Sequence, residues 1–111
     1  MDTMPMLVSQ FNLKPGVTAG SFETAWKAFV AELTALDLAV GSSALMSRQK
    51  DSGFDTDAPR DHRFMTLIRF SDQAQADLAW TAIETADPRI GRTHVGVLAL
   101  VEDPVFTFWA G

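Results

Sequence analysis

The 111-residue sequence contains no cysteine and no tyrosine. The absence of cysteine excludes disulfide bonds, thiolate nucleophiles and every metal site that depends on cysteine ligands. Without tyrosine, no phenol side chain can act as an acid, a base or a radical carrier. The eight Phe and three Trp are therefore expected mainly to pack the interior.

Basic residues are few, and long apolar runs are missing. Nine Lys and Arg stand against fourteen Asp and Glu, so the net charge is -5. An acidic chain without a basic stripe is not expected to bind nucleic acid or an anionic membrane surface. No stretch approaches the roughly 20 apolar residues of a membrane-spanning helix. The first six residues also lack the basic region of a signal peptide, so we expect a cytoplasmic protein.

The apolar content is sufficient for one folded domain. Hydrophobic residues make up 47% of the chain and charged residues 21%. The sequence has no internal repeat, low-complexity tract or linker. We therefore predict a single domain over residues 1–111.

Alternating side chains predict the strands. Residues 6–13 and 63–70 alternate between two faces, and each segment carries apolar residues on both. Residues 41–50 predict a weaker strand that is polar enough to lie near an edge. After Asp103-Pro104 interrupts the pattern, residues 105–109 predict a final strand.

Helical spacing predicts two helices and a shorter third. The first carries an apolar stripe and is capped by Thr18 or Ser21. The second follows Ser71 as its cap, with Asp72 just inside, and the third begins at Asp87-Pro88. A strand over residues 95–101 is the alternative to the third helix. The stripes of the three helices are, in turn, Phe22, Trp26, Phe29, Leu33 and Leu36; Ala76, Trp80 and Ile83; and Ile90, His94, Val97 and Val101.

This order predicts the α+β ferredoxin-like fold, β-α-β-β-α-β, with an extra short helix before the last strand. Its four-stranded antiparallel sheet would carry the helices on one face. The other face would present an apolar row: Met6, Val8, Met65 and Leu67. A soluble monomer rarely exposes such a patch, so we expect a homodimer formed through this open sheet face.

On this element order and length, nearly the whole chain resembles the dimeric α/β-barrel superfamily. That superfamily includes antibiotic-biosynthesis monooxygenases, haem-degrading monooxygenases, muconolactone isomerases and stress-responsive barrel proteins. The resemblance implies a barrel made by two copies. It carries no diagnostic motif, and a shared fold does not imply a shared function.

Several polar side chains share strand faces or helices with apolar ones. A mostly apolar pocket with a few convergent polar groups is typical of small-ligand sites. Solvated strand ends or a dimer rim are the alternative interpretation for the strand residues. The candidate pocket-lining residues are Gln10, Asn12, Met65, Arg69, Trp80 and His94.

Two cofactor hypotheses are weaker. Haem-degrading relatives are similar in using Asn, Trp and His, which Asn12, Trp80 and His94 match by residue type alone. The loop over residues 51–61 holds four aspartates beside His62, but it lacks the closing glutamate of a calcium loop. We expect a solvated loop, and neither a metal nor a cofactor.

The leading hypothesis is a homodimer that binds a small, largely apolar molecule between sheet and helices. The first alternative is a cofactor-independent monooxygenase of the antibiotic-biosynthesis type, in which Gln10, Asn12, Arg69 and His94 would donate hydrogen bonds or handle protons. The second alternative is a non-enzymatic interaction module with a filled core. The sequence assigns no catalytic residue and leaves open whether the protein is an enzyme.

Overall fold

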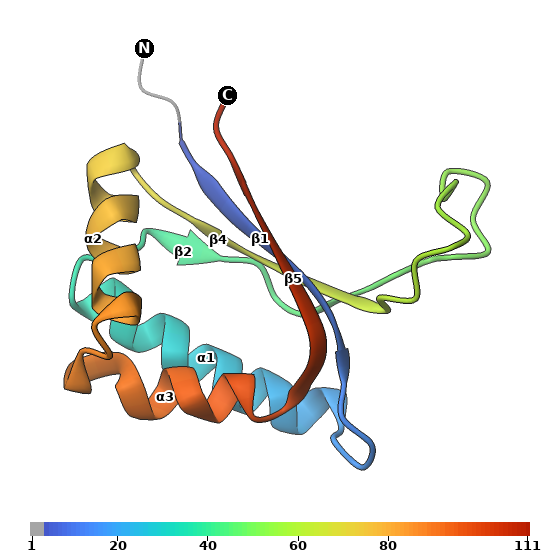
Figure 1. Cartoon of the computed structure of the whole chain (residues 1–111), viewed down its shortest axis with the longest axis horizontal. Coiled ribbons are helices and arrows are strands. Elements are labelled where there is room, and N and C mark those ends of the chain that lie inside the picture. Colours follow the sequence, from blue (N-terminus) through green and yellow to red (C-terminus); the bar gives the residue numbers. More distant parts are fainter. Residues whose placement is uncertain (1–3) are drawn as a thin grey trace.

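The structure is a computed structural model and describes residues 4–111. Its elements follow the expected order, with the extra helix before the last strand (Figure 1). The ferredoxin-like α+β prediction is therefore confirmed. In chain order the elements are β1 (Met6–Leu13), α1 (Ala19–Ala35), β2 (Gly41–Ser42), β3 (Met46–Ser47), β4 (Phe64–Arg69), α2 (Gln73–Glu84), α3 (Pro88–Leu98) and β5 (Val101–Trp109).

The sheet is antiparallel throughout. β1 lies between β4 and β5, and β2 and β3 both pair with β4 at the outer edge. The expected fourth strand is thus present as two short pieces. Between them the Ser43 hydroxyl accepts a hydrogen bond from the Leu67 backbone N–H at 2.9 Å. A side chain there substitutes for the regular ladder, which explains the interruption.

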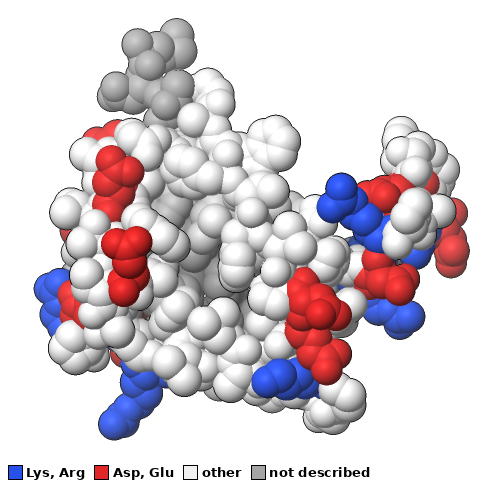
Figure 2. Space-filling model, in the orientation of Figure 1, with Lys and Arg blue, Asp and Glu red and all other residues white. Residues whose placement is uncertain are grey.

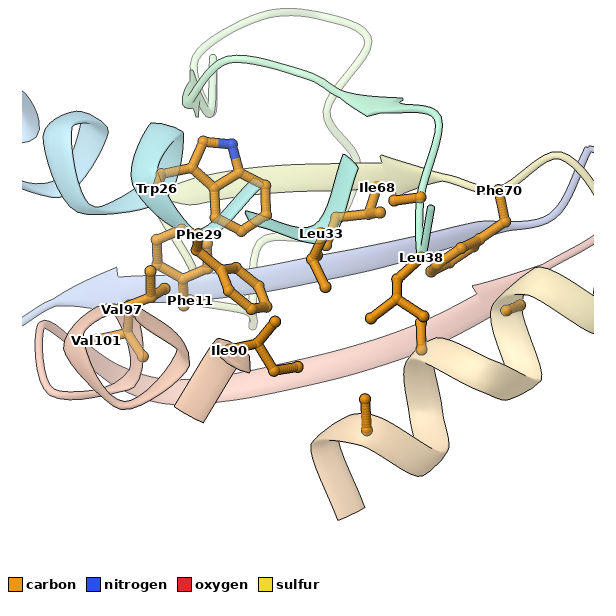
Figure 3. Packing of buried hydrophobic residues seen from close by; sticks show 14 of the residues in the cluster. Phe11, Trp26, Phe29, Leu33, Leu38, Ile68, Phe70, Ile90, Val97 and Val101 are labelled. Atoms are coloured by element: carbon orange, nitrogen blue, oxygen red, sulfur yellow. The ribbon is translucent and has the colours of Figure 1, made fainter. Parts of the chain in front are cut away.

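The helices cover one face of the sheet, and the core lies between the two layers (Figure 3). Alternation directs Leu7, Ser9 and Phe11 of β1 toward the helices. Thr66 and Ile68 of β4 face the same way, since Ser9 pairs with Thr66 and Leu7 with Ile68. Of the five positions in the predicted stripe of α1, the first four are buried (Phe22, Trp26, Phe29 and Leu33), and Leu36 is the half-buried C-cap.

Two of the three predicted helix N-caps are confirmed, and one is wrong. Thr18 caps α1 and Asp87 caps α3, as expected, with Pro88 at the start of α3. The cap of α2 is Asp72 rather than Ser71. Asp72 has an extended backbone, and its carboxylate accepts a hydrogen bond from the Gln75 N–H at 2.8 Å. A carboxylate at this position also complements the positive end of the helix dipole.

The predicted start of the last strand is also wrong. β5 begins at Val101 and passes through Asp103-Pro104, instead of starting at Val105. The register against β1 shifts between Gln10 and Asn12, and Asp103 has a positive φ of 52°. β5 is an edge strand with a bulge, so the missing N–H of proline costs no ladder bond there. The rival strand over residues 95–101 is wrong, because α3 extends to Leu98.

The face of the sheet opposite the helices, here called the open face, is apolar. Met6, Val8, Met65 and Leu67 are half-buried on it. Cross-strand register adds exposed apolar side chains, namely Met46 opposite Met65, Val105 opposite Gln10 and Trp109 opposite Met6. Within residues 4–111, no helix lies over these side chains, because all three helices are on the other face. Over this described part of the chain, none of the helices has the length and apolar character needed to cross a membrane.

Candidate ligand-binding cavity

A cavity of about 410 Å³ lies between the sheet and the helices. We call it the helix-side cavity. Figure 2 shows the molecule hollowed over this region, and the walls of the hollow are free of Lys, Arg, Asp and Glu on the visible face. Every layer of the fold contributes to its lining, which includes Leu7, Phe11, Ile68, Ile83, Val97, Leu98, Val101 and Pro104.

Helix α1 supplies an aromatic wall. Phe22, Trp26 and Phe29 line the cavity, and the Phe22 and Trp26 rings stack with centroids 6.1 Å apart. The indole N–H of Trp26 donates to the Ser43 carbonyl at 2.9 Å. Because its one polar atom is satisfied at the edge strand, Trp26 is held in place and presents only its apolar ring to the cavity.

Two hydroxyls lie on the sheet side of the cavity. Ser9 and Thr66 are directly opposite each other on β1 and β4, and both line the cavity. Side chains at such paired positions have Cβ atoms about 5 Å apart. Thr66 is only 1% exposed, and neither hydroxyl bonds to another protein group among residues 4–111. Both hydroxyls border the cavity, so this pair is available to a ligand atom.

His94 of α3 is the third polar group of the cavity. Its ring packs against Phe29, with centroids 5.4 Å apart. Burial lowers the pKa of His94 below its ordinary value, because the charged imidazolium is poorly solvated there. Near neutral pH the imidazole is therefore uncharged, with one nitrogen able to donate a hydrogen bond and the other able to accept one.

Two exposed aromatic side chains form the rim of the cavity. Trp80 of α2 is 61% exposed and Phe106 of β5 is 53% exposed, although both line the cavity. Trp80 was expected in the buried stripe of its helix. The buried positions are instead the small residues Ala76, Ala79 and Ala82, together with Gln75. Alanines let α2 approach its neighbours closely, and the larger indole remains at the opening.

The six sequence-predicted site residues do not share one pocket. Trp80 and His94 lie together in the helix-side cavity. Gln10 and Met65 point from the open face into a different hollow, described below. Asn12 accepts a hydrogen bond from the Arg63 backbone N–H at 2.9 Å. Since Asn12 belongs to the open-face row, it does not converge with Trp80 and His94, and the haem-type trio is not assembled.

Arg69 lies at the far end of β4, and its guanidinium passes over Gly41. A Cβ added at Gly41 would lie 3.1 Å from an Arg69 Nη. Because the nearest atom belongs to the end of an exposed, flexible side chain, a small shift of Arg69 would accommodate a larger residue at position 41. Arg69 is exposed and lies apart from the helix-side cavity.

Sequence reasoning missed Ser9 and Thr66, although a signal for both was present. Each is the polar member of an otherwise apolar row: Leu7, Ser9, Phe11 on β1, and Thr66, Ile68 on β4. A polar residue in the middle of a core-facing row needs a partner. The two rows could be recognised separately, but the register that brings the hydroxyls together could not.

Three of the four aspartates of the loop over residues 51–61 pair with basic residues. Arg48 binds Asp55, Arg60 contacts Asp57, and Lys50 lies near Asp61 at 3.5 Å. Over residues 4–111, no three His, Asp or Glu side chains are grouped as metal ligands would be. The predicted interpretation as a solvated loop agrees with these ion pairs.

Comparison with known proteins shows the fold and one family. The chain is similar to a mutant of SnoaB, a cofactor-independent oxygenase from Streptomyces nogalater, with 15% identity and a TM-score of 0.67 over 97% of this chain and 92% of that one. It is also similar to a dimeric ferredoxin-like protein of unknown function from Jannaschia sp. CCS1, with 15% identity and a TM-score of 0.63 over 96% and 97% of the two chains.

A third similar structure is an antibiotic biosynthesis monooxygenase, with 18% identity and a TM-score of 0.58 over 96% of each chain. These identities are low, so the likeness shows the fold alone. Curated proteins provide no match. A family model described as "Family of unknown function (DUF6614)" matches residues 4–109.

Proposed function

Given that the chain belongs to DUF6614, a family of unknown function, we propose that it is a homodimer that binds a small, uncharged, partly aromatic molecule in the helix-side cavity. The observation that carries the proposal is the cavity itself. Its volume of about 410 Å³ falls within the range of small-molecule sites. It is a recess between the sheet and the helices that opens at Trp80 and Phe106, and a fully packed layer interface would leave no such space.

The lining selects the chemistry of the ligand. Apolar and aromatic side chains dominate it, and no charged residue of the described chain belongs to it. A charged ligand would lose its hydration without gaining a partner. Ser9, Thr66 and His94 offer hydrogen bonds to one or two polar atoms. A flat, apolar molecule bearing a hydroxyl or carbonyl group matches this arrangement.

The open face supports the homodimer. It presents half-buried Met6, Val8, Met65 and Leu67 beside the more exposed Trp109, which is 60% exposed. Such a patch is typical of an interface. Solved structures of the same fold are described as dimeric. A second copy on this face would bury the patch while leaving the helix-side cavity accessible from the other side.

A binding experiment with neutral probes tests the ligand proposal. Titration with 1-naphthol, followed by tryptophan fluorescence, should show saturable binding, because Trp26 and Trp80 line the cavity. Val97→Phe places a larger side chain on the cavity wall and should weaken binding at least tenfold. The matched control is Val95→Phe, on the same helix at a position that is 63% exposed. Equal binding by both variants, or none by the wild type, would contradict the proposal.

A second candidate function is cofactor-independent oxygenation of a phenolic substrate. The specific observation is His94, which lines the apolar cavity and which burial favours in its uncharged form. A neutral imidazole can accept the proton of an acidic phenol, and the resulting anion is the form able to react with oxygen without a cofactor. Oxygen uptake with a panel of phenols, compared between wild type and His94→Phe, tests this function. Uptake that is absent, or unchanged in the variant, would argue against it.

The cytoplasmic location expected from the sequence stays a prediction, which fractionation of producing cells can check. The remaining alternative, an interaction module with a filled core, is less compatible with the cavity. Native mass spectrometry of the freshly purified protein would distinguish the two, since a retained small molecule supports binding.

A further inference from the structure

A long segment projects from the body of the molecule. Residues 48–63, here called the arm, connect β3 to β4 and extend away from the helices (Figure 1). The arm contains neither helix nor strand. A connection of this length without regular structure is uncommon in a small domain and is usually either disordered or functional.

A single side chain organises the arm from within. The guanidinium of Arg48 binds both carboxylate oxygens of Asp55, at 2.6 and 2.8 Å. It also donates to the backbone carbonyls of Asp57 at 2.6 Å, Arg60 at 2.5 Å and His62 at 3.3 Å. One rigid, planar group thus ties together both sides of the arm. Such a network favours a defined shape over a disordered connection.

Phe54 stands at a turn of this ordered segment and is 98% exposed. Its backbone is held, since its N–H donates to the Ser52 hydroxyl at 3.1 Å and the next N–H, of Asp55, donates to the Ser52 carbonyl at 3.1 Å. An exposed aromatic side chain on a backbone that is held in place is suited to bury itself in a partner. Buried aromatic anchors carry much of the binding energy at protein interfaces.

The arm and the open face of the sheet border a common open hollow of about 550 Å³. Gln10, Met46 and Met65 line it from the sheet, and Phe54 and Thr56 line it from the arm. Any molecule seated on the open face at this end therefore meets the arm as well. The proposed dimer surface and the arm form one continuous concave surface.

We propose that the arm is a clasp that closes over a second copy of this chain, with Phe54 as its anchor on the partner. This inference rests on the homodimer part of the proposed function, and it makes the arm the element that stabilises the dimer. Because a twofold dimer uses the same surface on both copies, each dimer has two clasps. The sheet faces then supply the area, and the arms add two anchored contacts at the ends.

The charges of the arm disfavour an anionic membrane as the occupant and permit a second copy. The arm carries four basic residues, Arg48, Lys50, Arg60 and Arg63, and four aspartates. The whole chain has a net charge of -5. Insertion of Phe54 into an anionic bilayer would need a basic surround, which this balance does not provide. The four basic and four acidic side chains of the arm cancel, so the arm does not repel a second copy of this acidic chain.

Dilution experiments test the clasp. The wild type, Phe54→Ser and the control Leu78→Ser, which removes another exposed apolar side chain on α2 (61% exposed), are compared by sedimentation over a range of concentrations. The dimer dissociation constant of Phe54→Ser should rise at least tenfold, and that of Leu78→Ser should not change. A dimer as tight as the wild type in Phe54→Ser would refute the clasp but leave the homodimer standing. A monomeric wild type would remove both.

A second measurement tests directly whether position 54 becomes buried when the dimer forms. The cysteine-free chain allows Phe54→Cys to carry a single polarity-sensitive fluorophore, with Leu78→Cys as the control. Emission of the Phe54→Cys conjugate should shift to shorter wavelength as concentration passes through the dimerisation range. Unchanged emission would overturn the clasp. Sedimentation of the wild type, but not Phe54→Ser, with phosphatidylserine vesicles would replace it with a membrane anchor.

Discussion

Replacing Thr66 with valine separates the ligand-binding role of the cavity from its role in stability. Thr66 is buried in β4 beside Ser9, and its hydroxyl faces the helix-side cavity without a protein partner among residues 4–111. Valine keeps the size and the β-branched shape, and it suits a strand equally well. The substitution therefore removes a hydrogen-bonding group and little else.

Two effects of different kind are expected. A buried polar group without a partner costs roughly 1–3 kcal/mol, and water in the cavity offsets part of this cost. The free energy of unfolding of Thr66→Val should thus be unchanged or about 1 kcal/mol higher. Loss of one neutral hydrogen bond, about 0.5–1.5 kcal/mol, should weaken 1-naphthol binding about two- to twelvefold. Binding of naphthalene, which has no hydroxyl, should not change.

Urea unfolding and fluorescence titration of both probes measure these effects, and Ser9→Ala is the companion variant. If Thr66→Val loses affinity equally for 1-naphthol and naphthalene, the hydroxyl does not contact the polar atom of the ligand. If the variant is destabilised by more than about 1 kcal/mol, the hydroxyl has a partner within the protein. Either result would refute the reasoning.

Three further outcomes are expected. Since burial lowers the pKa of His94, the unfolded chain binds its proton more readily. The contribution of neutral His94 to the free energy of unfolding is complete above the ordinary pKa of about 6.5 and is lost as pH falls below it. In urea unfolding, the stability of His94→Leu should therefore depend less on pH below 6.5 than that of the wild type. The pKa of Asp55 is lowered to about 2 by the hydrogen bonds from Arg48. The arm should therefore keep its protection from hydrogen exchange as pH falls through 4 and lose it near pH 2. In Asp55→Asn the arm should lose this protection already at neutral pH, with the melting temperature of the core nearly unchanged. Leu33→Ala, at a fully buried position in α1, should cost about 2–5 kcal/mol in thermal or urea unfolding, and a cost below 1 kcal/mol would place the core elsewhere.

The fold followed from local patterns that tertiary contacts reinforce. The stripe of α1 and the alternation of β1 and β4 each need only a few neighbouring residues to be recognised. Predictions failed where a side chain or an edge position overrode the local pattern. Asp72 displaced Ser71 as a cap, and the edge position of β5 allowed Asp103-Pro104 to remain within a strand. Neither the edge position nor the bulge can be recognised in a single segment.

The candidate site was less predictable than the fold. His94 and Trp80 were identified by residue type, and they do line the cavity. Gln10, Asn12, Met65 and Arg69 belong to the open face, because the register of β1 and β4 directs them away from the helices. Residue type suggests which side chains can bind a ligand. It does not say on which side of a sheet they lie.

By itself the sequence determined the element order, the apolar character of both sheet faces and the exclusion of cysteine chemistry, because each depends on composition or on spacing within one segment. Only the tertiary structure decided that the helices leave a cavity, that Ser9 and Thr66 meet in it, and that Arg48 shapes the arm around Asp55. These features arise from side chains that are distant in sequence or on different elements. Their positions depend on strand register and helix packing, which no local pattern specifies.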